Sequence, residues 1–336
     1  MLSWLVNVIT TSPWTTLCVM TLLTVTMAVT VLYATLPSPA PLPPLSFTDV
    51  RSGGQEAFPS LLSTAPAGVS LSLVVPMYNE EERLGVMLEE TMPFLEARVV
   101  ANPGWTYEVI LVDDGSSDST AKVASDFAAS YASSLPASAA AGCDIRVCVL
   151  PANRGKGGAV RAGVMVARGE YMLMVDADGA TQFSDLARLE DALAALDYPG
   201  KDNNGPVLGI AVGSRAHLQD DAVAERSFFR NLLMHAFHAL VATLCVSGIR
   251  DTQCGFKLFS RDAAKVIFPP LHLERWAFDV ELLYLAQAAR IPVAEVPVNW
   301  EEIPGSKLSV IAASISMAID LVRIRMAYML GFWQTV

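Results

Sequence analysis

The chain has 336 residues, a formal net charge of −11, and a composition of 52% hydrophobic and 17% charged residues. This length suits one α/β domain with appendages, and the apolar fraction is high for a purely soluble protein. The acidic balance argues against nucleic acid or anionic lipid as the main partner. The cysteines show neither metal-ligand spacing nor a disulfide framework, which favours free thiols in a reducing compartment: Cys18, Cys143, Cys148, Cys245 and Cys254.

The N-terminal segment is apolar and carries no charged residue from Met1 to Thr48. Residues 14–36 are enough to cross a hydrocarbon core of about 30 Å as a helix. A cleaved signal peptide is the alternative, and it is disfavoured because the segment lacks a basic leading region and a clear small-residue cleavage site. We therefore expect residues 1–36 to form a single-pass membrane anchor.

A proline-rich stretch follows the anchor. Residues 37–69 contain seven prolines together with serine and glycine, which predicts an extended tether rather than a packed element. The folded domain is expected to begin at Ser70 and to occupy residues 70–336.

From Ser70 onward, short apolar runs alternate with helical patterns. The runs occupy residues 71–78, 107–115, 145–150, 171–179 and 207–215. Such alternation predicts a doubly wound, mostly parallel α/β sheet. Asn79 and Glu82 have capping-box spacing for the first helix, the Ala/Ser-rich residues 130–142 are expected to be a loop insertion, and residues 308–333 are expected to form an amphipathic surface helix.

Polar residues follow each of these predicted strands. Ligands of open α/β sheets bind beyond the carboxyl ends of the strands, so these residues predict one functional rim. In chain order the rim comprises Tyr78 with Asn79 and Glu80, Asp113 with Asp114, residues 153–156, Asp176 with Asp178, and Arg215.

The segment Asp176-Ala177-Asp178 follows the fourth apolar run directly. Two carboxylates at i and i+2 on a strand-to-loop turn can face one hard cation, Mg²⁺ or Mn²⁺, which in turn holds a diphosphate. The alternative is a turn whose aspartates cap the following helix. The position after the fourth strand of the series favours the metal site.

Two further motifs admit a structural and a functional interpretation. Asp113-Asp114-Gly115 is either a tight turn or a carboxylate site for a nucleobase imide or a ribose. Lys156, which lies between glycines, can approach a phosphate. Its segment has neither the full P-loop pattern nor the G-x-G-x-x-G order, which excludes ATPase and dinucleotide-binding interpretations.

A basic cluster precedes the apolar residues 232–246 and consists of Arg215, Arg226 and Arg230. One interpretation is ordinary ion pairing with the acidic residues 220, 221 and 225. The other is a site for an anionic head group whose tail lies along the apolar helix.

Several segments resemble known families. The family 2 glycosyltransferases of the GT-A fold are similar in VVPMYNEEERL, VILVDDGSSDST, NRGKGGAVRAG and VDADGAT. The eukaryotic dolichyl-phosphate β-glucosyltransferases are similar in DTQCGFKLF, WAFDVELL and VPVNWEEIPGSKL. The resemblance implies UDP-glucose as donor, dolichyl phosphate as acceptor and inversion at the anomeric carbon. It also implies N-glycan precursor assembly at the endoplasmic reticulum membrane, with the catalytic domain facing the cytosol.

The resemblance also implies roles for individual residues. The uridine would be held by Pro76, Tyr78, Glu80, Asp113 and Asp114. Lys156 would lie near the diphosphate, and the metal and sugar site would be lined by Asp176, Asp178 and Gln182. The acceptor phosphate would be received by Arg215 and Arg230, with Lys257 as a further candidate. Asp279 is expected to orient the sugar or an arginine rather than to act as a base.

Two competing functions remain open. Dolichyl-phosphate mannose synthases, which use GDP-mannose, share the earlier motifs, but they usually carry a leucine at the position of Gly179 and lack the run from Trp300 to Lys307. A non-catalytic polyprenyl-phosphate binding module is the second alternative, and the intact Asp176-Ala177-Asp178 motif argues against it. A nucleotidyltransferase is weaker still, because no glycine-rich loop follows the first strand.

Overall fold

The structure is a computed structural model that describes residues 13–38, 41–42, 45–48, 55–57, 59–134, 143–198, 205–218, 237–303 and 310–335. Its N-terminal elements are α2 (Pro13–Thr35), β1 (Ser46–Thr48) and β2 (Gln55–Ala57). The first half of the domain contains β3 (Val69–Met77), α3 (Leu84–Ala101), β4 (Tyr107–Asp113), α4 (Thr120–Ser134), β5 (Cys143–Val149), α5 (Lys156–Met165) and β6 (Gly169–Met174). The second half contains η1 (Phe183–Asp185), α6 (Leu186–Ala195), β7 (Ile210–Ser214), β8 (Lys257–Ser260), α9 (Arg261–Ile267), α10 (Phe278–Ala288), β9 (Val293–Pro297) and α11 (Val310–Met329).

A seven-stranded sheet with the order β5-β4-β3-β6-β8-β7-β9 organises the domain. The strands β3, β4, β5 and β6 are parallel, β8 runs antiparallel to both β6 and β7, and β9 is parallel to β7. The carboxyl ends of six strands therefore meet the amino end of β8 at one edge. The order reverses between β3 and β6, which is where ligands bind in such sheets. The predicted, mostly parallel α/β fold is confirmed.

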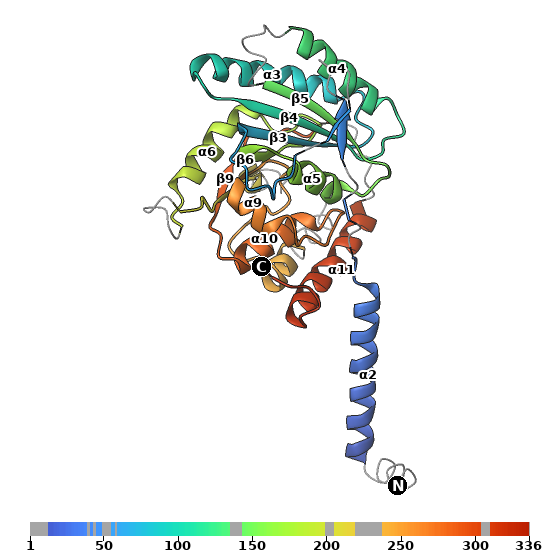
Figure 1. The fold of residues 1–336 in the computed structure, drawn as a ribbon. Coiled ribbons are helices and arrows are strands. Elements are labelled where there is room, and N and C mark those ends of the chain that lie inside the picture. Colours follow the sequence, from blue (N-terminus) through green and yellow to red (C-terminus); the bar gives the residue numbers. More distant parts are fainter. Residues whose placement is uncertain are drawn as a thin grey trace.

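Apolar side chains leave the strands on both faces and bury two cores. Along β3, Leu73 and Val75 join the core beneath α3, α4 and α6, whereas Val74 joins the core that α5, α9 and α10 cover. Figure 1 shows α3 and α4 on one side of the sheet and α5, α9 and α10 on the other. This alternation follows from the two-residue period of a strand. Because a core covers each face of the sheet, successive residues of a central strand are both apolar.

The segment expected to be an extended tether is packed in part. Strands β1 and β2 pair as an antiparallel hairpin, Phe47 lies 5.2 Å from the guanidinium of Arg146, and Leu61 is fully buried in the core. The prolines do not prevent this packing, because β1 and β2 have only three residues each and Leu61 is buried as a single side chain. Here the expectation of an unpacked tether was wrong.

Helix α2 projects from the domain as an isolated rod (Figure 1). Its residues 14–35 have a mean hydropathy of 2.1 and are not buried by the described residues. Within the described ranges it is the one helix long and apolar enough to cross a membrane. The ring of Tyr33, at the domain end of α2, meets Phe332 edge-on at 5.0 Å.

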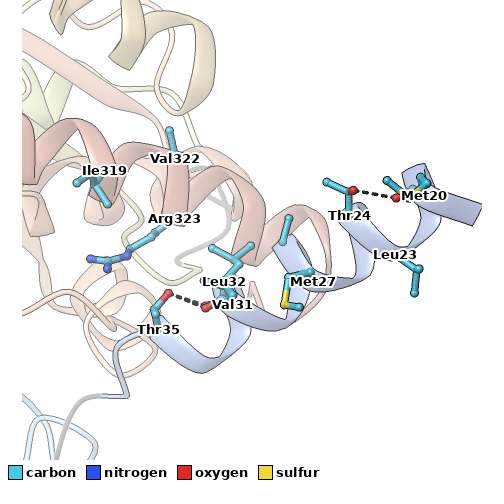
Figure 2. A pocket seen from close by; sticks show the side chains of 11 residues that line it. Met20, Leu23, Thr24, Met27, Val31, Leu32, Thr35, Ile319, Val322 and Arg323 are labelled. Atoms are coloured by element: carbon cyan, nitrogen blue, oxygen red, sulfur yellow. Dashed lines mark hydrogen bonds between the residues drawn. The ribbon is translucent and has the colours of Figure 1, made fainter. Parts of the chain in front are cut away.

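Helix α11 lies along the domain and alongside the end of α2. Its residues Leu321 and Ile324 are buried in the core, whereas Ile319 and Val322 are exposed. These two exposed side chains and Arg323 line an apolar groove between α11 and α2 (Figure 2). The other groove residues come from α2: Met20, Leu23, Thr24, Met27, Ala28, Val31, Leu32 and Thr35.

Two local expectations differ from the structure. Helix α3 begins at Leu84, five residues after Asn79, and its N-cap position makes no side-chain hydrogen bond. Asn79 instead adopts φ 57° and accepts the backbone N–H of Ser117 at 2.9 Å, so the predicted capping box was wrong. In the segment 130–142, α4 continues to Ser134, and the remaining residues of that expected loop lie outside the described ones.

Candidate active site

Asp176 and Lys156 form an ion pair at the edge where the strands end. Nζ of Lys156 lies 2.6 Å from Oδ1 of Asp176. Lys156 is the first residue of α5, and the preceding Gly155 adopts φ 88°, where an added Cβ would lie 2.7 Å from the carbonyl oxygen of Glu274. The glycine therefore lets α5 begin directly against the backbone of residues 274 and 275.

The two charges of this pair support each other. Burial raises the pKa of Asp176, but Lys156, together with Lys257 and Arg215, outweighs burial and holds that pKa below its ordinary value. Burial likewise lowers the pKa of Lys156, and the carboxylates of Asp176 and Asp279 outweigh it, so the net shift is upward. Both groups are therefore charged at neutral pH.

Asp178 lies in a loop that a distant segment fixes. Its Oδ1 accepts the N–H of Ala180 at 3.0 Å, and Ala180 in turn accepts the N–H of Glu301 at 2.8 Å. A bridge between Thr181 and Trp300 continues this pairing. The Trp300 segment thus borders the two aspartates, and the exposed Gln182 lies beside them.

Asp113 and Asp114 have different environments although they are adjacent. Oδ2 of Asp113 accepts the N–H of Ser116 at 3.2 Å, while its buried Oδ1 has no hydrogen-bond partner among the described residues. Both oxygens of Asp114 accept backbone N–H groups, from Arg154 at 2.7 Å and from Gly155 at 2.8 Å. Asp113 therefore retains a buried acceptor for a ligand, and Asp114 holds the loop that leads to Lys156.

The other residues expected around the nucleoside lie at the end of β3. Pro76 is half-buried, and Tyr78 is 48% exposed. Glu80 binds Arg83 through both carboxylate oxygens at 2.7 Å. Tyr78 is thus the side chain of this group that is presented to solvent.

Arg215 follows β7, and one edge of its guanidinium is bound to both carboxylate oxygens of Asp251. Its Nε and Nη2 lie 2.7 and 3.0 Å from the two carboxylate oxygens, and its guanidinium lies 5.4 Å from the ring centre of Trp300. Glu295 holds Asp251 in place: it accepts the N–H of Asp251 at 2.8 Å and the hydroxyl hydrogen of Ser214 at 2.7 Å.

Lys257 and Asp279 form a second ion pair, with Nζ 2.5 Å from Oδ1. The antiparallel β8 brings Lys257 to this edge, where it pairs with Met174 of β6 and Val212 of β7. Lys257 is fully buried, so it is not presented to a lipid phosphate. Among the described residues, the ion partner of Asp279 is this lysine.

The structure brings most of the predicted residues to one edge and adds some that the sequence did not single out. Arg226 and Arg230 lie outside the described residues. The additions are Asp251, Gly255 and Glu295; the family-like segments contain the first two without indicating their partners, and Glu295 lies outside them. Trp300, which the sequence marked only as part of the run to Lys307, lies beside Arg215. Over the described ranges, no group of three or more His, Cys, Asp or Glu side chains is placed to hold a metal ion.

Comparisons with known proteins identify the family. The family model of glycosyl transferase family 2 matches residues 72–268. A dolichyl-phosphate beta-glucosyltransferase from Dictyostelium discoideum is 52% identical over 86% of this chain and 84% of that protein. Relatives of the same name from Homo sapiens and Saccharomyces cerevisiae are 51% and 43% identical, over 84% and 79% of this chain and 82% and 77% of their own lengths.

The chain belongs to the dolichyl-phosphate beta-glucosyltransferase family. It is therefore a glycosyltransferase. A solved structure of glucosyl-3-phosphoglycerate synthase from Mycobacterium tuberculosis, in complex with Mn²⁺, UDP-glucose and phosphoglyceric acid, is similar with a TM-score of 0.52. At 16% identity over 77% of this chain and 80% of that one, this similarity shows the shared fold.

Proposed function

We propose that this protein transfers glucose from UDP-glucose to dolichyl phosphate and gives dolichyl β-D-glucosyl phosphate. The observation that carries the proposal is the 52% identity, over 86% of the chain, to a dolichyl-phosphate beta-glucosyltransferase. The site agrees with it, because acceptors and cations suited to a nucleoside diphosphate meet at one edge of the sheet.

Asp113 supports a uridine nucleotide as the donor. A buried carboxylate oxygen without a donor costs free energy, and the N–H of a uracil imide or a ribose hydroxyl would satisfy it. Asp114 contributes indirectly, since it fixes the loop before Lys156 through two backbone hydrogen bonds.

Asp176 and Asp178 would hold a divalent cation, Mg²⁺ or Mn²⁺. Their carboxylate oxygens are the ligands that such hard cations prefer, and the remaining positions would be taken by phosphate oxygens and water. The support for the fit is this donor set, and the backbone of Gly255 lies directly against one of its carboxylates, because an added Cβ there would lie 2.6 Å from Oδ1 of Asp176. When bound, the cation would stabilise the negative charge that develops on the leaving UDP.

The acceptor phosphate needs positioning more than deprotonation. A phosphate monoester has a second pKa near 6 and is largely dianionic at pH 7, so it can attack the anomeric carbon directly and invert it. Arg215 would neutralise its charge, with Arg230 as a second candidate. Asp279 is already bound to Lys257, which agrees with an orienting role and not with that of a base.

The anchor completes the proposal. We place residues 1–36 in the endoplasmic reticulum membrane as a single span, residues 37–69 as a connecting segment, and residues 70–336 as a cytosolic catalytic domain. The support is the apolar, unburied helix α2. The exposed apolar side of α11 beside it would contact the membrane surface.

Product analysis tests the proposal. The full-length protein is given dolichyl phosphate with UDP-glucose, UDP-galactose or GDP-mannose separately, and the lipid products are identified by mass spectrometry. We expect glucosylated lipid with UDP-glucose at a rate at least tenfold above the other donors. Mannosylated lipid as the main product would overturn the donor assignment, and no lipid product with any donor would overturn the acceptor assignment.

A further inference from the structure

Lys257 is a fully buried lysine whose charge no part of the proposed reaction uses. Its Nζ lies 2.5 Å from Oδ1 of Asp279 and donates to the carbonyl oxygen of Cys254 at 2.6 Å. Burying an ammonium is unfavourable unless it is paired. These two bonds join the turn before β8 to the first turn of α10, so Lys257 connects two elements at the active-site edge.

The turn that Lys257 holds lies directly against Asp176. A Cβ on Gly255 would lie 2.6 Å from Oδ1 of Asp176 and closer still to its Oδ2 and Cγ. The backbone of residue 255 is therefore one wall for this carboxylate, and Lys156, at 2.6 Å, is the other. The carboxylate cannot move toward the turn without a collision.

The turn is fixed on its other side by the sheet. The carbonyl of Phe256 accepts the N–H of Gly213 at 2.8 Å, and Cys254 is fully buried. The ammonium of Lys257 closes the remaining side through the Cys254 carbonyl. A rigid wall at this position determines where the carboxylate of Asp176 points.

We propose that Gly255 and Lys257 are positioning residues for Asp176: Lys257 fixes the turn to Asp279, and Gly255 holds the carboxylate in the orientation that binds a divalent cation with the donor diphosphate. The inference rests on the metal site of the proposed function. It assigns Lys257 to the geometry of the donor site and removes it from the acceptor site.

The test measures UDP binding by calorimetry with Mn²⁺ and with a chelator, in the full-length protein. In wild type we expect Mn²⁺ to strengthen UDP binding. In Gly255→Ala and in Lys257→Met, the factor by which Mn²⁺ strengthens UDP binding should be at least tenfold smaller than in wild type. The UDP affinity in chelator should stay within about twofold of the wild-type value. Gly209→Ala is the matched control, because a Cβ there would meet leucine side chains and not Asp176.

A double variant separates positioning from general damage. Asp176→Asn alone should abolish the effect of Mn²⁺, and adding Gly255→Ala to it should change nothing further.

Mn²⁺-dependent binding at wild-type strength in both Gly255→Ala and Lys257→Met would overturn the proposal and leave the metal site standing. Equal losses with and without Mn²⁺ would also overturn it. If Mn²⁺ does not strengthen UDP binding in wild type, the metal site itself is wrong and the positioning role falls with it. A wrong sugar or acceptor would leave all these binding differences in place.

Discussion

Arg215 shows how one side chain can serve both the fold and the acceptor. Asp251 occupies one edge of its guanidinium with two hydrogen bonds, and a guanidinium has five N–H donors. The remaining donors can bind an anionic head group. Asp251 thereby holds the arginine in one orientation.

The first prediction concerns acceptor affinity. Arg215→Ala removes a charge-assisted contact, which costs on the order of 1.5–3 kcal/mol. The apparent KM for dolichyl phosphate should rise about ten- to hundredfold, with UDP-glucose binding nearly unchanged. Steady-state kinetics with each substrate varied will measure both. Arg215→Lys, which retains the charge, should lie between wild type and alanine, and a collapse of donor affinity would assign Arg215 to the nucleotide site.

The second prediction concerns the absence of a base. Burial raises the pKa of Asp279, and Lys257 and Lys156 offset that only in part, so this carboxylate resembles a base by its pKa alone. Asp279→Asn should still turn over, because the amide oxygen can accept from Lys257, whereas removing a true base costs about 10²–10⁴-fold. In both proteins the rate at excess acceptor should fall below about pH 6 with the acceptor phosphate. A loss above about a thousandfold, with folding and donor binding intact, would show that a base is needed.

The third prediction is a pH dependence of stability. Burial raises the pKa of Asp114 to about 6, above the usual value of about 3.9. Between these two values the folded protein binds more protons than the unfolded chain, so the stability contributed by Asp114 falls as pH rises and is constant above about pH 6. The free energy of unfolding of wild type minus that of Asp114→Asn should therefore decrease from pH 4 to pH 6. Urea unfolding across this range will measure it, and parallel pH profiles would contradict it.

The sequence predicted the edge of the site but not its ion pairs. Asp113, Asp176 and Arg215 each follow an apolar run directly, so the neighbouring residues in the sequence are enough to place them at strand ends. The partners of Arg215 and of Lys257 lie 36 and 22 residues away along the chain. Charge alone does not select a partner at that separation, because pairing depends on how the strands are ordered in the sheet.

At the scale of elements, β8 limited the fold prediction. The strands β3 to β7 were recognisable as apolar runs bounded by polar residues, whereas β8 and β9 were not predicted. Strand β8 has four residues and begins with a lysine, which reads as a polar position in isolation. Its antiparallel insertion between β6 and β7 is what brings Lys257 to the active-site edge.

Helices α10 and α11 are joined by a buried carboxylate. Glu281, in α10, is fully buried and accepts the N–H of Leu273 at 2.7 Å and the hydroxyl of Tyr328 at 2.8 Å. The backbone N–H of His272 also donates to Glu281 at 3.0 Å, and the ring of His272 stacks on Trp333 at 4.2 Å. The end of α11 is thus fixed to a residue two positions from Asp279, so α11 and the candidate site share one support.

The fourth prediction tests this joint. Tyr328→Phe leaves Glu281 without one of its hydrogen bonds, and we expect a loss of about 1–3 kcal/mol in the free energy of unfolding. Denaturant unfolding will measure it. Tyr284→Phe is the control, because that ring stacks on Tyr328 at 4.8 Å and no described partner bonds its hydroxyl, so its effect should stay below about 0.5 kcal/mol. Equal effects of the two substitutions would contradict the role of the Glu281 bond.

At the scale of the whole molecule, the proposed membrane contact would be divided between α2 and α11. Helix α2 provides length, and α11 provides the exposed apolar residues Ile315, Ile319 and Val322. Helices α2 and α11 lie side by side at the domain end of α2 (Figure 1), and there Tyr33 meets Phe332, which follows α11, at 5.0 Å. A catalytic domain held in this way would meet a lipid phosphate at the membrane surface without searching in solution.

The fifth prediction is that the anchor supplies access to the acceptor and not the chemistry. Deletion of residues 1–36 removes α2 and the Tyr33 contact but retains every residue of the sheet edge. The truncated protein should bind UDP-glucose with unchanged affinity and turn over dolichyl phosphate in liposomes at least tenfold more slowly, because tethering raises the effective concentration of the two partners by large factors. With a short-chain polyprenyl phosphate dissolved in water, its rate should match the full-length protein, since that acceptor needs no membrane. Full activity on liposomes would show that α11 suffices for access, and an equal loss with both acceptors would show that α2 supports the folded domain itself.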